Sequence, residues 1–433
     1  MADESHAELL SYAQAAACVA AHAKLTARSK LGTERVRLAA AAGRVLAQTL
    51  RADADQPPFA RSTRDGYACR AAEISTHRPL IVSGSTHAGD PPSGPLARGT
   101  VWEIMTGAPI PRGADAVVML EHVESASTTA AASIRLLPPR TVEPGENIVA
   151  RGAQARKGAA LLPPGSLIGA EQIALVASCG AAELAVYARP RVAILSTGDE
   201  LVPIATTPKP GQIRNSSSAM LAAMVSAAGG DPWTLPIARD AAKSLDAALT
   251  RAAAADLLLI TGGVSAGKFD LVEPALARLG ARFHFTGVRI QPGKPVVFGE
   301  FPRRATKLVQ NQNRAKRQNG TKCCFLGLPG NPVSSAVTFL LFAAPILAAL
   351  AGRAEIGPRF ALARLTEDVK VKPGLTRFLP AACTFAGTEP DVSPVAWQGS
   401  GDLAAMARAN CFLVVPDDCE RLPAGAITTI LLL

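Results

Sequence analysis

Apolar positions in the first 50 residues follow a helical spacing, in the Ala- and Leu-rich runs AELLSYAQAAACVAAHA and RVRLAAAAGRVLAQTL. This spacing predicts two helices within residues 8–49. From Asp53 to about Arg140, short β-branched runs such as LIVSG, TVWEIM and ADAVVML alternate with Gly/Pro turns, as in a small β-rich domain. Glycine turns and a helical stretch follow. We predict a helical linker domain from residues 1–50 and 141–185, and a β-rich domain at 51–140.

The pattern changes near Val186, where apolar strands begin to alternate with helical stretches. The runs are RVAILS, SSSAMLAAMVSAAG, WTLPIA, SLDAALTRAAAA and DLLLITGG. Such a βαβ series predicts a three-layer α/β domain with a parallel sheet over residues 186–352. Short strands and turns return at 353–433 and predict a C-terminal β domain resembling a barrel. The expected fold class is therefore multidomain, α/β plus β.

The longest apolar stretch runs from Ala336 to Gly352. It is shorter than the ~20 residues that cross a bilayer, and it contains Pro345, so we expect a buried core helix kinked at the proline. An apolar fraction of 48% excludes global disorder. The eight cysteines contain no CxxC pair, and the first ten residues lack a signal-peptide pattern. We predict a soluble cytoplasmic protein with no membrane association.

The net charge of +10 is concentrated in one segment, residues 301–322, which contains seven basic and no acidic residues. The rest of the chain therefore carries only +3. The segment has no apolar period, which favours a surface insertion; the alternative is a polyanion-binding arm. Because no aromatic residues are interleaved with the basic ones, nucleic-acid binding is not favoured. The basic residues are Arg303, Arg304, Lys307, Arg314, Lys316, Arg317 and Lys322.

Two loops that follow apolar strands carry candidate chemistry. In TGGVSAGKFD, glycines 262, 263 and 267 allow backbone N–H groups to approach an anion, although a tight structural turn would look the same. In STGDE, Asp199 and Glu200 would lie at the carboxyl end of a strand, where open α/β sheets bind ligands. The pair could hold Mg²⁺. The alternative is that Asp199 caps a helix and Glu200 is solvated.

Two further loops are of the same kind. In IQPGKP, the flanking prolines would fix the direction of Lys294, a point charge for a phosphate, although an ordinary surface lysine fits equally. In GLPGNPVSS, a turn leads into a helix whose N-terminal end could bind an anion, although capping explains the residues as well. RDGY and MTGAP in the β-rich domain are, taken alone, hairpin turns.

Nine segments taken together resemble one family, in its order along the chain. They are PPFARSTRDGYA, IMTGAPIPRGADAVVMLE, GENIVARGA, AILSTGDELV, GQIRNSSSAML, TGGVSAGKFD, QPGKPVVFG, GLPGNPVSSAVTF and QGSGDLAAMARAN. The family is the molybdopterin molybdenumtransferases, the MoeA-type enzymes of molybdenum cofactor biosynthesis, to which the C-terminal domain of gephyrin is related. The resemblance runs from about residue 8 to the C-terminus, interrupted by the basic segment.

The resemblance implies an activity and an assembly. Family members take adenylylated molybdopterin and molybdate, release AMP and insert molybdenum, with Mg²⁺ as cofactor. They are homodimers of four-domain chains, with the active site between the α/β domain of one chain and the β-rich domain of the other. It also implies transfer of the product to molybdoenzymes.

The same resemblance assigns site residues by motif. The catalytic set is Asp65, Thr106, Glu200, Asp240, Asp270 and Lys294. Within it, Asp65, Glu200 and Asp270 would bind the metal, and Asp240 could instead cap a helix. The substrate-binding set is Gly262, Gly263, Ser265, Gly267, Gly330, Asn331, Ser334 and Ser400.

The chain also departs from the family pattern near these motifs. FARSTRDGYA replaces FDNSAMDGYA, so that Ala60, Arg61 and Arg64 stand for Asp, Asn and Met. Gln154 replaces an acidic residue and Gln291 a lysine. These changes are the support for a second hypothesis, a non-catalytic molybdopterin-binding scaffold. A third, adenylylation of molybdopterin, is disfavoured because stand-alone adenylyltransferases lack the β-rich domains.

Overall fold

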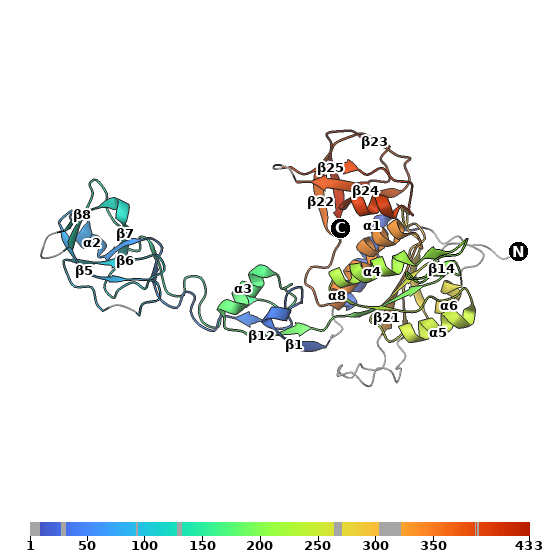
Figure 1. The fold of residues 1–433 in the computed structure, drawn as a ribbon, viewed down its shortest axis with the longest axis horizontal. Coiled ribbons are helices and arrows are strands. Elements are labelled where there is room, and N and C mark those ends of the chain that lie inside the picture. The colour runs from blue at the N-terminus through green and yellow to red at the C-terminus, as the bar shows by residue number, and fades with distance from the viewer. Residues whose placement is uncertain are drawn as a thin grey trace. The chain divides into compact units, whose positions relative to one another are not determined.

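The computed structural model describes residues 9–26, 32–91, 94–127, 132–263, 271–302, 322–385, 387 and 389–433. Contacts within the chain divide it into two compact units (Figure 1). The first comprises Met1–Ala47, Pro164–Gly169 and Glu183–Leu433. The second comprises Gln48–Pro163 and Ala170–Ala182. Each unit is described by itself.

The first unit contains a six-stranded sheet in the order β16-β13-β17-β21-β20-β18. Strands β13, β16, β17 and β21 are parallel, which confirms the predicted α/β domain; β20 alone runs antiparallel to both of its neighbours. The strands are β13 (Arg191–Ser196), β16 (Asp231–Thr234), β17 (Leu257–Thr261), β18 (Arg282–Thr286), β20 (Val297–Pro302) and β21 (Lys322–Leu328).

Helices cover both faces of this sheet (Figure 1). Successive residues of a strand point to opposite faces, so the unbroken apolar runs of β13 and β17 supply two cores. Ile194 and Leu259 pack with α1 (Tyr12–Thr26), α4 (Ser216–Ala227), α7 (Pro332–Thr338) and α8 (Ala344–Leu350). Leu195 and Leu258 pack with α5 (Ala242–Ala252) and α6 (Val272–Arg278).

The predicted apolar core helix is present and irregular. It is formed by α7, a π-helical turn at Phe339–Ala343, and α8, which contains Pro345. Proline has no N–H and its ring collides with the carbonyl four residues back, so the wider turn just before Pro345 accommodates it. Pro332–Leu350 has the length and composition of a membrane span, but 89% of its most apolar window is buried inside the protein. This segment is therefore a helix of the protein core.

One of the two predicted N-terminal helices is wrong. The first is α1, but Thr33–Arg37 forms strand β1, which pairs antiparallel with β12 (Glu183–Tyr187) and is followed by a 3-10 turn, Leu38–Ala40. Gly43, at φ +72°, interrupts the run that was expected to continue as a helix. A short isolated helix is marginal, so pairing with a distant strand determines the conformation.

The second unit is built on a sheet in the order β7-β4-β6-β5-β9-β8. Its strands are β4 (Gly66–Cys69), β5 (Leu80–Thr86), β6 (Thr100–Ile104), β7 (Ala116–Met119), β8 (Val123–Ser127) and β9 (Ala132–Leu136). Shorter elements complete the unit: β2 (Leu50–Arg51), β3 (Arg61–Ser62), α2 (Ala71–Ile74), a 3-10 turn (Leu120–His122), β10 (Ile148–Val149), β11 (Ala160–Leu162) and α3 (Ala170–Ser178). A Cβ on Gly66 would lie 1.9 Å from the carbonyl oxygen of Val118, so glycine is required where β4 meets β7.

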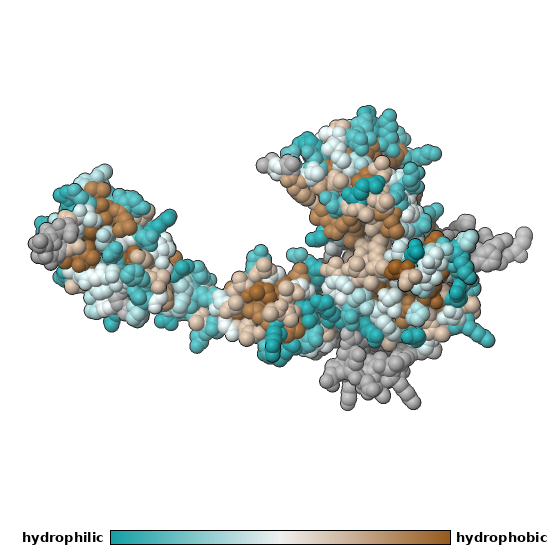
Figure 2. Space-filling model, viewed as in Figure 1, coloured by the Kyte–Doolittle hydropathy of each residue, from teal (hydrophilic) through white to brown (hydrophobic). Residues whose placement is uncertain are grey.

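The C-terminal strands close into the predicted barrel. Its five strands pair in the order β24-β25-β22-β28-β26, and β26 pairs back onto β24. They are β22 (Phe360–Leu365), β24 (Thr376–Thr384), β25 (Asp391–Pro394), β26 (Cys411–Val415) and β28 (Ile427–Leu432). Apolar side chains interrupt the polar surface of this domain (Figure 2). The remaining elements are β14 (Leu201–Val202), β15 (Ile213–Arg214), β19 (Ile290–Gln291), β23 (Val369–Lys370), β27 (Arg421–Leu422) and α9 (Leu403–Arg408).

Candidate active site

Asp65 and Thr106, taken from two separate motifs, are bonded to each other in the second unit. Asp65 lies in the turn before β4 and Thr106 in the turn after β6, and these strands pair with Gly66 opposite Ile104. The backbone N–H of Thr106 donates to Asp65 Oδ1 at 2.7 Å, and its hydroxyl donates to the same oxygen at 2.9 Å. Both side chains are exposed.

These two bonds lower the pKa of Asp65 below its ordinary value, the backbone N–H having the larger effect and the hydroxyl the next. The carboxylate is therefore ionised at neutral pH. Both bonds end on Oδ1, and no described residue donates to Oδ2. Asp65 thus presents an anionic oxygen with a fixed orientation, which can hold a cation or accept a proton.

Replacing Thr106 by Val is expected to move the acidic limb of the kcat/KM profile toward higher pH. The substitution removes the hydroxyl bond and keeps the backbone bond, so the pKa of Asp65 rises part of the way to its ordinary value. Asp65 then takes up its proton at a higher pH as the solution is acidified. Thr106→Ser, which retains the hydroxyl, serves as the control. An unshifted limb in Thr106→Val would show that the ionisation of Asp65 does not govern turnover.

In the first unit, the loops after three parallel strands meet at one edge of the sheet. Gly262 follows β17 at φ +87°, and a Cβ there would lie 2.5 Å from the carbonyl oxygen of Thr197, in the loop after β13. A Cβ on Gly263 would lie 2.7 Å from Thr197 Oγ1, and one on Gly330, after β21, 3.6 Å from Gly262 Cα. The glycines predicted from two motifs are therefore neighbours, and their lack of side chains is what permits the approach.

Thr197 is a residue that the motif comparison did not single out. Its hydroxyl is buried between the glycine loops and has no hydrogen-bond partner among the described residues. A buried hydroxyl without a partner is uncommon, and at a ligand crevice it is available to a ligand atom or a water. The only signal in the sequence was its position in STGDE, immediately after the strand.

Asn331 and Ser400 come from different domains of the first unit and are bonded to each other. Asn331 Nδ2 donates to Ser400 Oγ at 2.7 Å, and the backbone N–H of Val333 donates to the carbonyl of Ser400 at 3.1 Å. Asn331 precedes α7 without capping it through its side chain. Ser334, one turn into the helix, is buried, so of these residues Asn331 is the more accessible.

Glu200 and Asp240 are exposed at the same edge of the sheet. The Glu200 carboxylate folds against Gly198, and Arg239, beside Asp240, lies 3.6 Å from the Asp199 carboxylate. Helix α5 has Ala241 as its N-cap and no side-chain cap bond, so Asp240 does not cap it. Asp199 is followed by strand β14 and caps no helix.

Lys294 reaches this edge because of the direction of β20. Val297, the first residue of β20, pairs with Gly327, near the end of β21. The antiparallel direction therefore puts the start of β20, and the loop that carries Lys294, at the edge where the parallel strands end. Lys294 is exposed, and its ammonium group has no bonded partner within the described part of the chain.

A hollow of about 520 Å³ adjoins these residues. Its lining is largely apolar, with a few polar side chains, as in many small-molecule sites. Leu201 and Arg239 in the lining are the sequence neighbours of Glu200 and Asp240. The lining residues are Leu201, Pro203, Ile204, Asn215, Ser218, Ala219, Thr234, Leu235, Pro236, Ile237 and Arg239.

The chemistry of the predicted metal ligands fits Mg²⁺. Asp65 and Glu200 offer exposed carboxylate oxygens, the donors that this hard cation prefers. Asp270, together with Ser265 and Gly267, lies outside the described residues.

Three family profiles match consecutive parts of the chain. They are the MoeA N-terminal region (domain I and II) at residues 10–180, a probable molybdopterin binding domain at 193–349, and the MoeA C-terminal region (domain IV) at 362–433. Proteins named molybdopterin molybdenumtransferase are similar over most of their length. The one from Haemophilus influenzae is 31% identical over 92% of this chain and 93% of its own. The one from Bacillus subtilis is 32% identical over 93% and 90%.

The chain belongs to the molybdopterin molybdenumtransferase family. Its fold agrees with this assignment. The crystal structure of the molybdopterin biosynthesis moeA protein from Pyrococcus horikoshii OT3 matches it with a TM-score of 0.77 and 27% identity, covering 98% of this chain and 100% of that one.

The departures from the family pattern leave the Asp65–Thr106 pair intact. Neither Arg61 nor Arg64 forms an ion pair with Asp65 in the described structure. Gln154 and Gln291 are exposed. Gln154 uses its backbone N–H to bond the carbonyl of Gln56 at 2.9 Å. Arg64 is exposed and Arg61 is half-buried, and neither neutralises the Asp65 carboxylate by direct contact.

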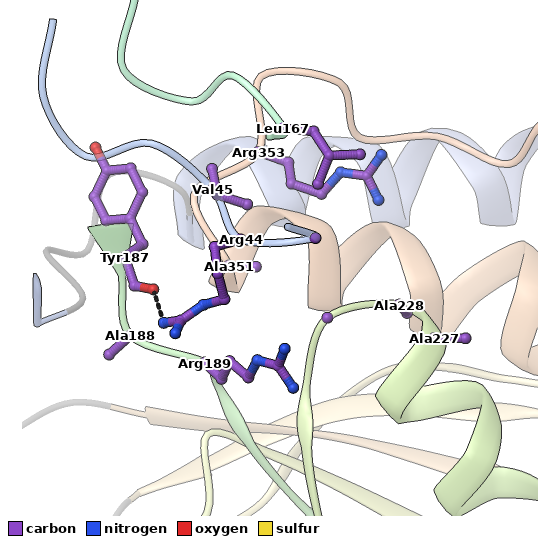
Figure 3. A pocket seen from close by; sticks show the side chains of 12 residues that line it. Arg44, Val45, Leu167, Tyr187, Ala188, Arg189, Ala227, Ala228, Ala351 and Arg353 are labelled. Carbon is purple, nitrogen blue, oxygen red and sulfur yellow. Dashed lines mark hydrogen bonds between the residues drawn. The ribbon is translucent and has the colours of Figure 1, made fainter. Parts of the chain in front are cut away.

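A smaller cavity, of about 110 Å³, lies apart from these loops (Figure 3). Arg44, Arg189 and Arg353 contribute to its lining, next to the last residues of α4 and α8. Arg44 donates to the carbonyl of Tyr187 at 2.9 Å and to Glu34. Cations at helix C-termini offset the negative end of the helix dipole. The helix C-termini therefore explain the presence of the arginines, and no ligand is needed to explain it. None of the predicted site residues lines this cavity.

Proposed function

We propose that this protein inserts molybdenum from molybdate into adenylylated molybdopterin, with release of AMP, to form the molybdenum cofactor. The observation that carries the proposal is the convergence of Gly262, Gly263, Gly330 and Lys294 at one edge of the sheet. Backbone amides at glycine turns together with a lysine provide positive potential for a polyanionic substrate. Membership of the transferase family supports the same reaction.

Each predicted site residue has a part in the proposed reaction. Gly262, Gly263, Ser265, Gly267, Gly330, Asn331, Ser334 and Ser400 bind the substrate. Lys294 attracts its phosphates, Asp65, held by Thr106, orients the reacting group, and Asp240 belongs to the same catalytic set. Asp65, Glu200 and Asp270 would hold Mg²⁺, which would supply positive charge to the phosphate oxygens.

Turnover of adenylylated molybdopterin tests the proposal directly. Purified protein is given Mg²⁺ and molybdate, and AMP release and molybdenum incorporation are followed together. Coupled appearance of both, one for one, supports the transferase. Tight binding of the substrate without AMP release would instead support the scaffold hypothesis, to which the charge changes at Arg61, Arg64, Gln154 and Gln291 point.

We further propose that the protein acts as a cytoplasmic homodimer and passes its product to molybdoenzymes. The support is the family resemblance. Sedimentation equilibrium of the full chain measures the assembly, and a mass equal to that of one chain across the working concentration range would reject it. Transfer is measured as activation of an apo-molybdoenzyme by the completed reaction mixture.

Replacing Lys294 by Met is expected to reduce kcat/KM for adenylylated molybdopterin by about 10- to 100-fold, mainly through KM. A hydrogen bond to a charged group contributes about 1.5–3 kcal/mol, and Met keeps the length of the side chain without the charge. The control is Lys370→Met, which removes an exposed lysine from strand β23 of the C-terminal domain. Steady-state kinetics at two salt concentrations measure the effect, and equal loss in both variants would exclude a specific contact by Lys294.

A further inference from the structure

A second group of metal-ligating side chains lies in the first unit, unrelated to the family motifs. His22 comes from α1, His284 from β18 and Glu300 from β20. Each offers one ligand atom, and these three atoms lie within 4.8 Å of one another. His22 Nε2 is 3.6 Å from Glu300 Oε2. Three segments far apart in the sequence thus bring two imidazoles and a carboxylate to one point.

One nitrogen of this cluster lacks the hydrogen-bond partner that a buried polar atom normally has. His284 Nε2 is buried and has no hydrogen-bond partner in the described part of the chain. A bound ion would explain that unpartnered nitrogen.

The surroundings of the cluster orient its ligands. Lys322 Nζ bonds Glu300 Oε1 and leaves Oε2 facing His22. Phe298 packs against both imidazoles, with ring centroids 5.3 Å from His22 and 5.0 Å from His284. Cys324 Sγ, 3.4 Å from His22 Nε2, is a further nearby donor. A carboxylate fixed by an outer partner and an apolar wall are recurrent features around protein metal sites.

The spacing matches a tetrahedral ion of the zinc class. Bonds of about 2.0–2.2 Å place tetrahedral ligand atoms about 3.3–3.6 Å apart. The 3.6 Å between His22 and Glu300 is already in this range, and the 4.8 Å limit for the set leaves a side-chain adjustment of little more than 1 Å. We propose that His22, His284 and Glu300 bind one Zn²⁺ ion, with solvent as the fourth ligand.

This site is distinct from the proposed active site. Glu300 pairs with Cys324 and lies in the half of β20 that ends at Pro302, whereas Lys294 precedes the other end. A zinc ion at this place would join α1 to two strands of the sheet, β18 and β20. Zinc binding at this place is independent of whether the protein transfers molybdenum.

Zinc binding is tested on the full chain without a histidine tag. The protein is stripped with a chelator and titrated with Zn²⁺ by calorimetry, and the bound metal is measured after gel filtration. We expect one Zn²⁺ per chain and a higher melting temperature. His284→Gln and Glu300→Gln each lower the affinity by about 100-fold or more, since even loss of an outer partner costs 10- to 100-fold.

The matched control is His87→Gln. His87 Nδ1 also lies near a carboxylate, 3.3 Å from Asp90 Oδ2, but the pair is exposed and has no third ligand among the described residues. This variant should bind Zn²⁺ like the wild type. Circular dichroism verifies that each variant is folded.

A Co²⁺ titration of the unmodified protein does not depend on how the substitutions affect folding. Co²⁺ in place of Zn²⁺ should give the intense visible bands of a four-coordinate ion, which Zn²⁺ then displaces. Failure of the wild type to bind stoichiometric zinc, or affinity unchanged in folded His284→Gln, would overturn the proposal. In that case the three side chains form a polar cluster without metal.

Discussion

Asp65→Asn is expected to reduce molybdenum insertion by about 100- to 1,000-fold, comparable to the loss of one electrostatic group that stabilises a transition state. Asn keeps the size and shape of the side chain, and its Oδ1 can still accept both bonds from Thr106. What is lost is the negative charge on the second oxygen. The fold is preserved, so the deficit falls on the chemical step and appears in kcat.

Coupled measurement of AMP release and molybdenum incorporation tests this expectation. The control is Asp90→Asn, which also removes an exposed carboxylate of the second unit that accepts a backbone N–H, from His87 at 2.7 Å. Asp90→Asn should have wild-type turnover. Equal rates for Asp65→Asn and the wild type would exclude a catalytic role for Asp65, whatever the family pattern suggests.

Gly262→Ala is expected to destabilise the α/β domain by about 2–5 kcal/mol and to abolish turnover. The left-handed conformation costs a non-glycine residue about 1–2 kcal/mol, and forcing a methyl group into packed structure costs about 1–3 kcal/mol more. At Gly262 both apply, since φ is +87° and the new Cβ would lie 2.5 Å from the backbone oxygen of Thr197. The backbone at Thr197 cannot move aside as easily as a flexible side chain, so the loop after β17 must move instead.

Scanning calorimetry measures the effect as a lower melting temperature for the transition that includes the α/β domain, because a chain with several domains does not unfold in one step. Gly357→Ala is the control. That glycine belongs to the same unit, has no positive φ, and has no atom within 4 Å of an added Cβ. A Gly262→Ala protein with normal melting and turnover would mean that the loop can be accommodated differently.

The α/β domain could be predicted because β13, β17 and β21 are largely apolar runs that are each followed by a loop containing glycine. The direction of β20 could not be predicted, because an apolar run does not indicate whether its strand lies parallel or antiparallel to its neighbours. This direction places Lys294 with the glycine loops. The family resemblance assigned Lys294 to the site without a geometric reason. The antiparallel direction of β20 provides that reason.

Other features depend on contacts between distant segments. The strand at Thr33–Arg37 has the composition of a helix and is determined by its partner at Glu183–Tyr187. The bond between Asp65 and Thr106 follows from the register of β4 on β6. His22, His284 and Glu300 have no common spacing, because they come from a helix and two strands. No local pattern could have joined them.

The antiparallel pairing of β20 with β21 has a consequence for the length of the connection between them. Pro302 and Lys322 pair with each other, so the two points of the chain that residues 303–321 connect are already held together. In general, the entropy cost of closing a chain between two fixed points grows only with the logarithm of the number of residues, and going from two residues to 19 adds about 2 kcal/mol. The length of the connection is therefore a small term beside the strand pairing, and the pairing itself fixes the position of Lys294.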